Sequence, residues 1–388
     1  MFKKGEEVKK VVILVSSPFN QRDRERFGVE ILQKNGFEVK VWDFTPFLNP
    51  WRWKSFIPDG KSNFEEYYVF YTKKEAISAI SELTNYCLIV CVINYSYETI
   101  FLYRAISRYR LPYCLVLYNW ISYDINSHKN ISKRLGNLTL RKLLEYLFLK
   151  IPYKLLGIKP VKIVLMLGGE FNLSRQPVDK TTEIIKSHYF DYDIYLKEIQ
   201  KPAEFDDHMA VFLDHYLPFH PDWGTSARLD PSEYYPLLCK FFDCLDKNYG
   251  IHVVIAAHPR SAYENLPDYF NGRRIIRDKT AELVRRCKFV IAHHSASTSF
   301  AVLFRKPVIF VTTDKLKQIQ LGEMTDFMAS MFNKVPINLS GDFKVDLDRE
   351  LMVDDDVYKK YETDYIKKEG AEAIPIWQTF ANYLKNAE

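Results

Sequence analysis

Histidines and small hydroxyl residues gather at one point of the sequence, where an apolar run gives way to a helical pattern. The stretch 290–311 reads VIAHHSASTSFAVLFRKPVIFV, in which the histidines are followed by a serine-rich segment. The first turn of a helix presents unpaired N–H groups and a partial positive charge, so we expect a phosphate there. The alternative is a plain N-cap serine, and one of the two histidines is expected to be packed. The assigned residues are His294, Ser295, Ser297, Thr298 and Ser299.

A second motif, IAAHPR at 255–260, ends another apolar run. His258 can donate a hydrogen bond to a phosphate oxygen, and Arg260 offers a two-pronged fork. Pro259 is expected to stop the strand and fix the loop. The pair is a weak signal alone, but it gains weight beside the serine-rich junction two strands later.

A third motif, VFLDHYLPFHPDW at 211–223, places acidic and basic groups after an apolar run. Asp214 or its rival His215 is expected to act as a general base. The alternative for Asp214 is capping of the strand end. A zinc site made of His215, His220 and Asp222 is disfavoured, because prolines interrupt the loop and the spacing is not helical.

The loop after the first apolar run, LVSSPFNQRDRERFG at 14–28, lacks the GxGxxG pattern that dinucleotide binding requires. The sequence contains neither GxxxxGK[ST] nor GxSxG, which argues against P-loop and hydrolase chemistry. The polar side chains of this loop are suited to sugar hydroxyls. The residues expected to bind an acceptor are Ser17, Asn20, Gln21, Arg22, Asp23 and Asn119.

The elements that would position these motifs alternate as apolar runs and amphipathic segments, which is typical of α/β folds with parallel sheets. In residues 1–200 we expect a strand near 11–15, one helix over 21–36, and strands at 37–45, 87–95, 113–120 and 161–169. A polar linker at 198–208 follows. In residues 208–370 we expect strands at 209–214, 251–259, 288–295 and 307–314, with helices at 231–250, 280–287 and 298–305. A closing helix over 371–388 is expected to pack toward the first domain.

Two tandem Rossmann-like domains facing a cleft, with these motifs in the second, resemble the GT-B glycosyltransferases. The motifs are similar to the HP and serine-rich donor motifs of bacterial surface-polysaccharide transferases, including CMP-sialic-acid and Kdo-using groups; the matching residues are His258, Pro259, Ser295 and Ser297. The sequence departs from those groups because it lacks their Asp/Glu-Asp-Gly triplet. Asp214 or Asp23 is therefore only a candidate base, and the identity of the donor nucleotide is left open.

The resemblance implies a metal-independent glycosyltransferase that moves a sugar from a CMP- or UDP-linked donor to a glycan or lipid-linked acceptor in capsule or lipopolysaccharide synthesis. It implies no cofactor, since the nucleotide sugar is a substrate. A UDP-sugar epimerase of the same fold and a non-catalytic nucleotide-sugar-binding protein are the alternatives. The sugar, the stereochemical outcome and the oligomeric state are left open.

The composition bounds the protein's partners and location. A net charge of +5 over 388 residues is too small to indicate nucleic acid. The six cysteines lack zinc spacing and mostly lie in apolar runs, so we expect buried free thiols in a reducing cytoplasm. The first apolar run, 11–15, is too short for a signal segment.

The basic, apolar stretch 128–159 is expected either to contact the inner leaflet of the membrane or to pack as an ordinary helix.

Overall fold

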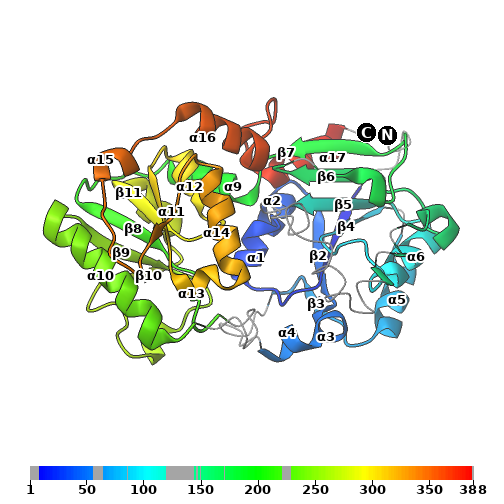
Figure 1. The fold of residues 1–388 in the computed structure, drawn as a ribbon. Helices are drawn as coiled ribbons and strands as arrows, with labels where there is room; N and C mark the ends of the chain where they lie inside the picture. Colours follow the sequence, from blue (N-terminus) through cyan, green and yellow to red (C-terminus); the bar gives the residue numbers. More distant parts are fainter. Residues whose placement is uncertain are drawn as a thin grey trace. The chain divides into compact units, whose positions relative to one another are not determined.

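A computed structural model describes residues 8–55, 64–84, 86–118, 144–145, 147–148, 150–169, 171–220 and 229–386. Within these residues the chain forms two compact units. The first takes the described residues up to 190 together with 367–386, and the second takes 191–366 (Figure 1).

The first unit is built on a seven-stranded parallel sheet in the order β3-β2-β1-β4-β5-β6-β7. Its central strands are apolar and buried on both faces, as expected where helices cover both sides of a parallel sheet. The strands are β1 (Lys10–Val15), β2 (Glu38–Asp43), β3 (Tyr67–Val69), β4 (Cys87–Cys91), β5 (Tyr113–Tyr118), β6 (Ile163–Leu167) and β7 (Glu183–Ser187).

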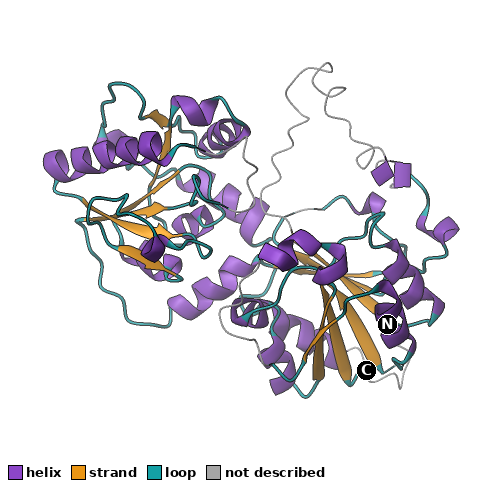
Figure 2. Ribbon diagram, turned by 90° about the horizontal axis from the view of Figure 1, so that it is seen from below, coloured by secondary structure: helices purple, strands orange, loops and turns teal. Residues whose placement is uncertain are grey.

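Two apolar layers cover this sheet. One layer holds Val29, Leu32 and the C-terminal helix, and the other holds residues of α5 and α6 such as Ile80 and Ile106. Figure 2 shows helices on both sides of each sheet. The helices are α1 (Gln21–Arg26), α2 (Val29–Lys34), α3 (Thr45–Leu48), α4 (Pro50–Ser55), α5 (Lys73–Ser81), α6 (Ile100–Arg108), α17 (Ile376–Asn386) and the short 3₁₀ turns η1 (Tyr153–Leu156) and η2 (Leu173–Arg175).

The second unit repeats the plan with a six-stranded parallel sheet in the order β10-β9-β8-β11-β12-β13. Strand order reverses between β8 and β11, so the crevice beyond their carboxyl ends is the place where such sheets bind ligands. The strands are β8 (Met209–Leu213), β9 (His252–Ala257), β10 (Ile275–Arg277), β11 (Phe289–Ala292), β12 (Val308–Thr312) and β13 (Ile337–Asn338).

Helices again lie on both faces of the second sheet. α10 and α13 pack on the face that carries Phe212, and α11, α12 and α14 pack on the face that carries Val211. The helices are α9 (Phe190–Glu198), α10 (Pro231–Tyr249), α11 (Thr280–Arg286), α12 (Thr298–Leu303), α13 (Asp314–Lys317), α14 (Gln320–Ser330), α15 (Leu347–Glu350), α16 (Asp355–Tyr361), the 3₁₀ turn η4 (Tyr263–Asn265) and the π-helical turn η5 (Glu362–Ile366).

The predicted fold class, two tandem Rossmann-like α/β domains, is confirmed by these two sheets. All six cysteines are free; five are buried and Cys244 is half-buried, in agreement with the sequence prediction. The short edge strands β3, β10 and β13 carried no clear apolar run and were not predicted. Neither was β7, whose alternation of half-buried and exposed residues is that of an edge strand.

The prediction of one helix over 21–36 is wrong, because Gly28 breaks it into α1 and α2. Gly28 has a φ of +60°, in the left-handed region that glycine tolerates best. The cause lies 349 residues further along the chain, where the ring of Trp377 in α17 sits against this glycine. The indole N–H of Trp377 donates to the carbonyl oxygen of Arg26 at 2.8 Å, which ties the C-terminal helix to the break.

Replacing Gly28 by alanine is therefore expected to destabilise the first unit by about 3 kcal/mol, combining a left-handed backbone penalty with a steric clash. A Cβ at this position would lie 2.1 Å from the Trp377 ring. Urea unfolding followed by tryptophan fluorescence measures the loss. Gly36→Ala is the matched control, because Gly36 also has a positive φ, +94°, but no atom within 4 Å of the added Cβ. Equal losses in the two variants would show that the Trp377 contact contributes nothing.

Candidate functional site

The carboxyl ends of the three central strands of the second sheet bring three predicted histidines to one level. Strand register pairs Leu213 with Ala256 on one side and Phe212 with Ile291 on the other. Continuing both registers places His215 opposite His258 and opposite His294. This row crosses the strand-order reversal between β8 and β11, so it occupies the edge where a ligand is expected.

Imidazole rings fill this edge. The rings of His215 and His294 stack with centroids 4.6 Å apart. The rings of His220 and His258 meet edge to face at 4.7 Å. With His293, five of the chain's nine histidines lie in this cluster, which we call the histidine cluster. Burial and repulsion from the neighbouring imidazoles hold the pKa of His215 well below its ordinary value, and burial also lowers the pKa of His293 and His294, so these three rings are neutral at pH 7.

His293 is the packed member of the cluster. Its Nδ1 lies 2.6 Å from the carbonyl oxygen of Val311, which can only accept, so Nδ1 carries the proton. Its Nε2 therefore accepts from the Tyr234 hydroxyl at 2.7 Å. Both nitrogens are used and burial lowers the pKa to about 4, so His293 holds β11 to its neighbours rather than meeting a ligand.

His258 has its tautomer fixed by the loop that follows it. The backbone N–H of Arg260 donates to Nδ1 of His258 at 3.1 Å. The ring proton of the neutral imidazole is therefore on Nε2, which makes that nitrogen a hydrogen-bond donor, as a phosphate oxygen requires. The Arg260 side chain is exposed at the rim of the same edge.

Asp214 has its carboxylate oxygens occupied by protein donors. One oxygen accepts from the backbone N–H of Tyr216 at 3.0 Å, and the other accepts from the Tyr263 hydroxyl at 2.9 Å. Tyr263 in turn lies 3.0 Å from the hydroxyl of Tyr235. Burial raises the pKa of Asp214 to about 6 despite these hydrogen bonds. The sequence left two roles open for Asp214, base or strand-end cap, and these contacts are those of a cap.

The backbone just after Asp214 is strained. Tyr216 has a φ of +55°, which is costly for a residue with a Cβ. The hydrogen bond from its N–H to Asp214 and the packing of its ring against Tyr263, with centroids 5.1 Å apart, hold it there. His215 lies between Asp214 and Tyr216, so this strained turn sets the direction of its side chain at the sheet edge.

Neither ring nitrogen of His215 hydrogen-bonds to a described residue. Nδ1 is buried without a partner in the described part of the chain. The residue as a whole is half-buried, which leaves Nε2 as the nitrogen that can reach a substrate. Of the two residues predicted as base, His215 is the one whose acceptor atom is not occupied.

The serine-rich segment supplies fewer free donors than expected. The backbone amides of Thr298, Ser299 and Phe300 already donate to carbonyl oxygens three residues earlier, at 3.0–3.1 Å. The expectation of unpaired amides at the start of this helix is therefore wrong for its first turn, since a tight turn precedes the six residues of α12. Side chains, and not these backbone amides, must therefore stabilise a negative charge bound at this edge.

The hydroxyls of the segment divide into two groups. Ser299 is buried and donates to Asp191 of α9, and Thr298 is fully buried. Ser295 accepts from the backbone N–H of Ser297 at 3.3 Å and directly follows His294. Ser295 and Ser297 are thus the hydroxyls of this segment that lie next to the histidine cluster without being tied to another helix.

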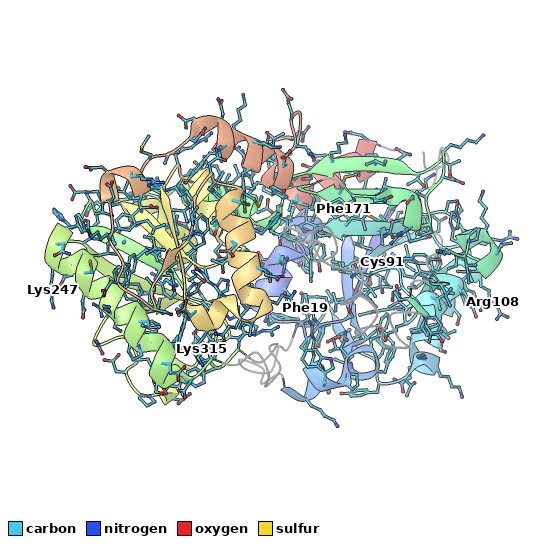
Figure 3. The ribbon with its side chains drawn as sticks, viewed as in Figure 1. Phe19, Cys91, Arg108, Phe171, Lys247 and Lys315 are labelled. Atoms are coloured by element: carbon cyan, nitrogen blue, oxygen red, sulfur yellow. The ribbon has the colours of Figure 1, made fainter. Side chains whose placement is uncertain are left out.

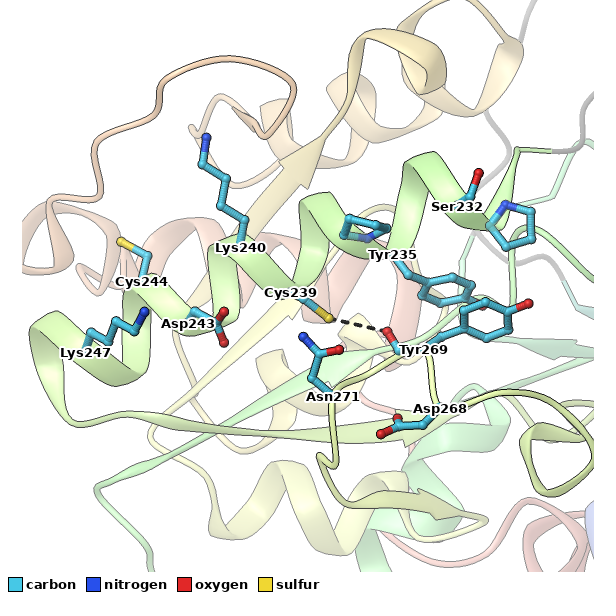
Figure 4. A pocket seen from close by; sticks show the side chains of 12 residues that line it. Ser232, Tyr235, Cys239, Lys240, Asp243, Cys244, Lys247, Asp268, Tyr269 and Asn271 are labelled. Atoms are coloured by element: carbon cyan, nitrogen blue, oxygen red, sulfur yellow. Dashed lines mark hydrogen bonds between the residues drawn. The ribbon is translucent and has the colours of Figure 1, made fainter.

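A cavity of about 560 Å³ opens beside α10, lined by Tyr235, Tyr269, Cys239 and nine further residues (Figure 4). The Cys239 thiol donates to the carbonyl oxygen of Tyr269 at 3.4 Å. Tyr235 links this cavity to Asp214 through Tyr263, but none of the histidines lines it. We therefore place the candidate site at the histidine cluster and not in this cavity.

Acidification is expected to loosen the second unit. Burial lowers the pKa of His293 to about 4 and of His294 to about 3. A group whose pKa falls on folding contributes stability fully above its unfolded pKa, near 6.5, and loses it as pH drops toward the folded value. Asp214, with its pKa raised to about 6, acts in the opposite direction below pH 6, but the histidines outnumber it.

The measurement is hydrogen–deuterium exchange of the β8 and β11 peptides between pH 7.5 and 4.5, corrected for intrinsic exchange rates. Protection is expected to fall with pH, and pyrophosphate is expected to restore it more than chloride of equal ionic strength, because an anion favours the charged imidazoles. Protection that stays constant over this range would contradict a neutral buried cluster.

The acceptor residues predicted at 17–23 lie on α1 or just before it. Asn20 caps α1 by accepting from the backbone N–H of Asp23 at 3.0 Å, and Gln21 donates to Glu25 at 3.0 Å. Ser17 and Asp23 are half-buried, and Arg22 is exposed. These residues lie beyond the carboxyl end of β1, but their side chains have mostly local partners. Arg26, the last residue of α1, was not among the predicted acceptor residues.

Some predictions concern residues outside the described part of the chain. Asn119 and Asp222 are among them, as is most of the stretch 128–159. Of that stretch, Leu147, Ile151 and Leu155 are described and exposed. Within the described residues, every helix is too short or too polar to cross a membrane.

Comparison with known proteins extends the fold assignment. No protein-family model and no curated protein matches the sequence. A variant of the wall teichoic acid polymerase TagF superposes with a TM-score of 0.54 and 14% identity, over 98% of this chain and 89% of that chain. The UDP-GlcNAc 2-epimerase of Methanocaldococcus jannaschii gives 0.49 and 10%, over 97% and 99%. The calicheamicin glycosyltransferase CalG4 gives 0.42 and 8%, over 97% and 93%.

At these identities the similarity concerns the fold alone. The neighbours are GT-B proteins, and the match to the polymerase extends over both units of this chain. The predicted GT-B fold class is therefore confirmed.

Proposed function

We propose that this chain is a glycosyltransferase that takes a sugar from a nucleotide-sugar donor, CMP- or UDP-linked, without a bound metal. The second unit would bind the donor, and the first would bind a glycan or lipid-linked acceptor in cell-surface polysaccharide synthesis. The fold supports this proposal, because the solved structures it matches include enzymes named for UDP-sugars and for glycosyl transfer.

One observation carries the proposal: His215, His258 and His294 stand in a row at the strand-order reversal of the second sheet. Neutral imidazoles need no counter-charge when the site is empty. A bound anion raises their pKa and so favours their protonated, positively charged form. A diphosphate or monophosphate leaving group is such an anion. A core function alone does not require His215 to keep both nitrogens unpartnered among the described residues.

The chemistry assigned to these residues is the following. The acceptor hydroxyl oxygen forms a bond to the anomeric carbon, and the bond from that carbon to the donor phosphate oxygen breaks. The electron pair stays on the phosphate, where Nε2–H of His258, the Arg260 guanidinium and the hydroxyls of Ser295 and Ser297 would offset its charge. His215 would take the acceptor proton on Nε2.

The acceptor is proposed to reach the enzyme at a membrane surface on its cytoplasmic side. The exposed apolar residues Leu147, Ile151 and Leu155 alternate with Lys150 and Lys154, a pattern that suits an anionic interface. Binding to vesicles with and without anionic lipid tests this part separately from catalysis.

The donor is tested by a thermal-shift screen of CMP-, UDP-, GDP- and dTDP-sugars, repeated with a chelator present. A donor is expected to raise the melting temperature because it binds the native state, and the chelator is expected to leave that rise unchanged. The hit is then incubated with membrane extracts as acceptor source, and radiolabelled sugar is followed into the lipid or glycan fraction.

The outcomes separate three functions. Label in the acceptor fraction supports a transferase. Isomerisation of the donor sugar without any acceptor would instead make the chain an epimerase of the same fold. Donor binding with neither reaction would make it a binding protein, and no response to any nucleotide sugar would contradict the proposal altogether.

A further inference from the structure

Arg26 lies at the carboxyl edge of the first sheet, on two aromatic rings that come from different strand ends. It is the last residue of α1, and its guanidinium carbon is 4.1 Å from the ring centroid of Phe190 and 5.3 Å from that of Tyr118. Tyr118 ends β5, and Phe190 follows β7. The two rings meet edge to face at 5.3 Å, so they form a rigid floor under the arginine.

The stacked arrangement leaves the donors of Arg26 available. Rings engage the face of a guanidinium, whereas its N–H groups point outward in the plane, in a fork that fits a phosphate or carboxylate. Nε of Arg26 is buried and makes no hydrogen bond to any described residue, and no carboxylate of the described chain pairs with this side chain. A buried charged donor without a partner is costly, so a missing anionic partner is indicated.

Arg24, two residues earlier on the same helix, shows what a structural arginine looks like here. Its guanidinium pairs with Glu66 at 2.7 Å and also with Glu30. Among the described residues, Arg24 thus pairs with two carboxylates and Arg26 with none. The difference argues against reading Arg26 only as a packing residue.

The surroundings of Arg26 carry further polar groups of mixed charge. Burial raises the pKa of the Tyr118 hydroxyl; the nearby cations Arg26 and Arg52 oppose this rise, and Asp23 adds to it. Two cations and one anion therefore lie near this hydroxyl donor. This combination suits a doubly charged group such as a phosphate better than a neutral sugar hydroxyl.

We propose that Arg26, held on Phe190 and Tyr118, binds a phosphate group carried by the acceptor. This inference rests on the proposed function, because it assigns the first unit to the acceptor. It narrows the acceptor to a phosphate-bearing molecule, such as a lipid-linked sugar phosphate or a phosphate-containing polymer.

The test is arginine labelling of the full-length wild-type protein with phenylglyoxal, mapped residue by residue by mass spectrometry. Inorganic phosphate is expected to slow labelling of Arg26 about tenfold relative to chloride at equal ionic strength. Arg108 is the control within the same sample. It also lies over an aromatic ring, that of Tyr109, at 6.0 Å, but it ends α6 and is exposed away from the carboxyl edge (Figure 3).

Each outcome decides the inference. Phosphate protection of Arg26 but not of Arg108 supports it. Protection of neither residue, or equal protection of both, overturns it. UDP or CMP alone protecting Arg26 would also overturn it, because the phosphate recognised there would then be the donor's. None of these results depends on turnover, so the inference can fail while the histidine cluster still binds a donor.

A conservative variant gives a second measurement. Arg26→Lys keeps a charge over the rings but loses the fork, so KM for a phosphate-bearing acceptor is expected to rise about tenfold while kcat changes little. The same variant is expected to leave KM for the nucleotide sugar unchanged. A rise in both KM values, with lower stability, would show that Arg26 is only a packing residue.

Discussion

Replacing His258 by glutamine is expected to lower kcat by about 10²–10³-fold, the usual cost of removing one donor that stabilises developing charge. The reason is the fixed tautomer. Because the Arg260 N–H occupies Nδ1, Nε2 carries the proton and can donate to the leaving phosphate. The measurement is steady-state transfer with the donor identified by thermal shift, with kcat and KM resolved separately.

The same strand supplies the matched control. His252 is the first residue of β9, at the end opposite to His258, and it is exposed, with an ion-pair distance of 3.6 Å to Asp206. His252→Gln is expected to leave kcat and donor KM unchanged. Equal losses in the two variants would point to damage of the strand, and an unchanged kcat in His258→Gln would remove this histidine from the mechanism.

Much of the candidate site could be predicted from sequence because parallel sheets align strand ends. His258, Asp214 and His294 each follow an apolar run by one or two residues, and the doubly wound pattern favours a sheet in which β8 lies beside both β9 and β11. The side-by-side placement of His215 and His294 then needs only the register. The spacing in the sequence therefore predicted where each site residue lies relative to the end of its strand.

The roles of individual atoms could not be predicted, since they depend on contacts with distant residues. The carboxylate of Asp214 is occupied by Tyr263, 49 residues later, whose position depends on a short 3₁₀ turn with no strong sequence signal. The amides at 298–300 are occupied because a tight turn precedes α12, and a serine-rich segment is equally compatible with open or closed amides. The composition therefore identified the serine-rich segment but could not show which of its backbone amides are unpaired.

The break at Gly28 and the position of Arg26 share one long-range cause. Trp377 in the C-terminal helix fills the space beside Gly28 and binds the carbonyl oxygen of Arg26. The amphipathic pattern of 21–36 by itself favours one helix, and only the tertiary contact overrides it. By ending α1 at Arg26, the break sets where that side chain meets Tyr118 and Phe190.

His215 and Asp214 are adjacent in sequence, and their substitutions are expected to affect different quantities. His215→Gln is expected to lower kcat by about 10²–10⁴-fold, the range for loss of a general base, with donor affinity retained. Its kcat profile is also expected to lose the decline at acidic pH, because the group that must be unprotonated is gone.

Asp214→Asn is expected instead to reduce stability by about 1–3 kcal/mol, because the amide cannot accept both the Tyr216 N–H and the Tyr263 hydroxyl. Any loss of kcat should shrink at lower temperature, where the fold is retained. Urea unfolding and pre-steady-state turnover on the same preparations separate the two effects. A stable Asp214→Asn variant without turnover, beside an active His215→Gln variant, would transfer the role of base to the carboxylate. The hydrogen bonds of Asp214 argue for the reverse, since each of its carboxylate oxygens already accepts a donor from the protein, whereas Nδ1 of His215 has no partner among the described residues.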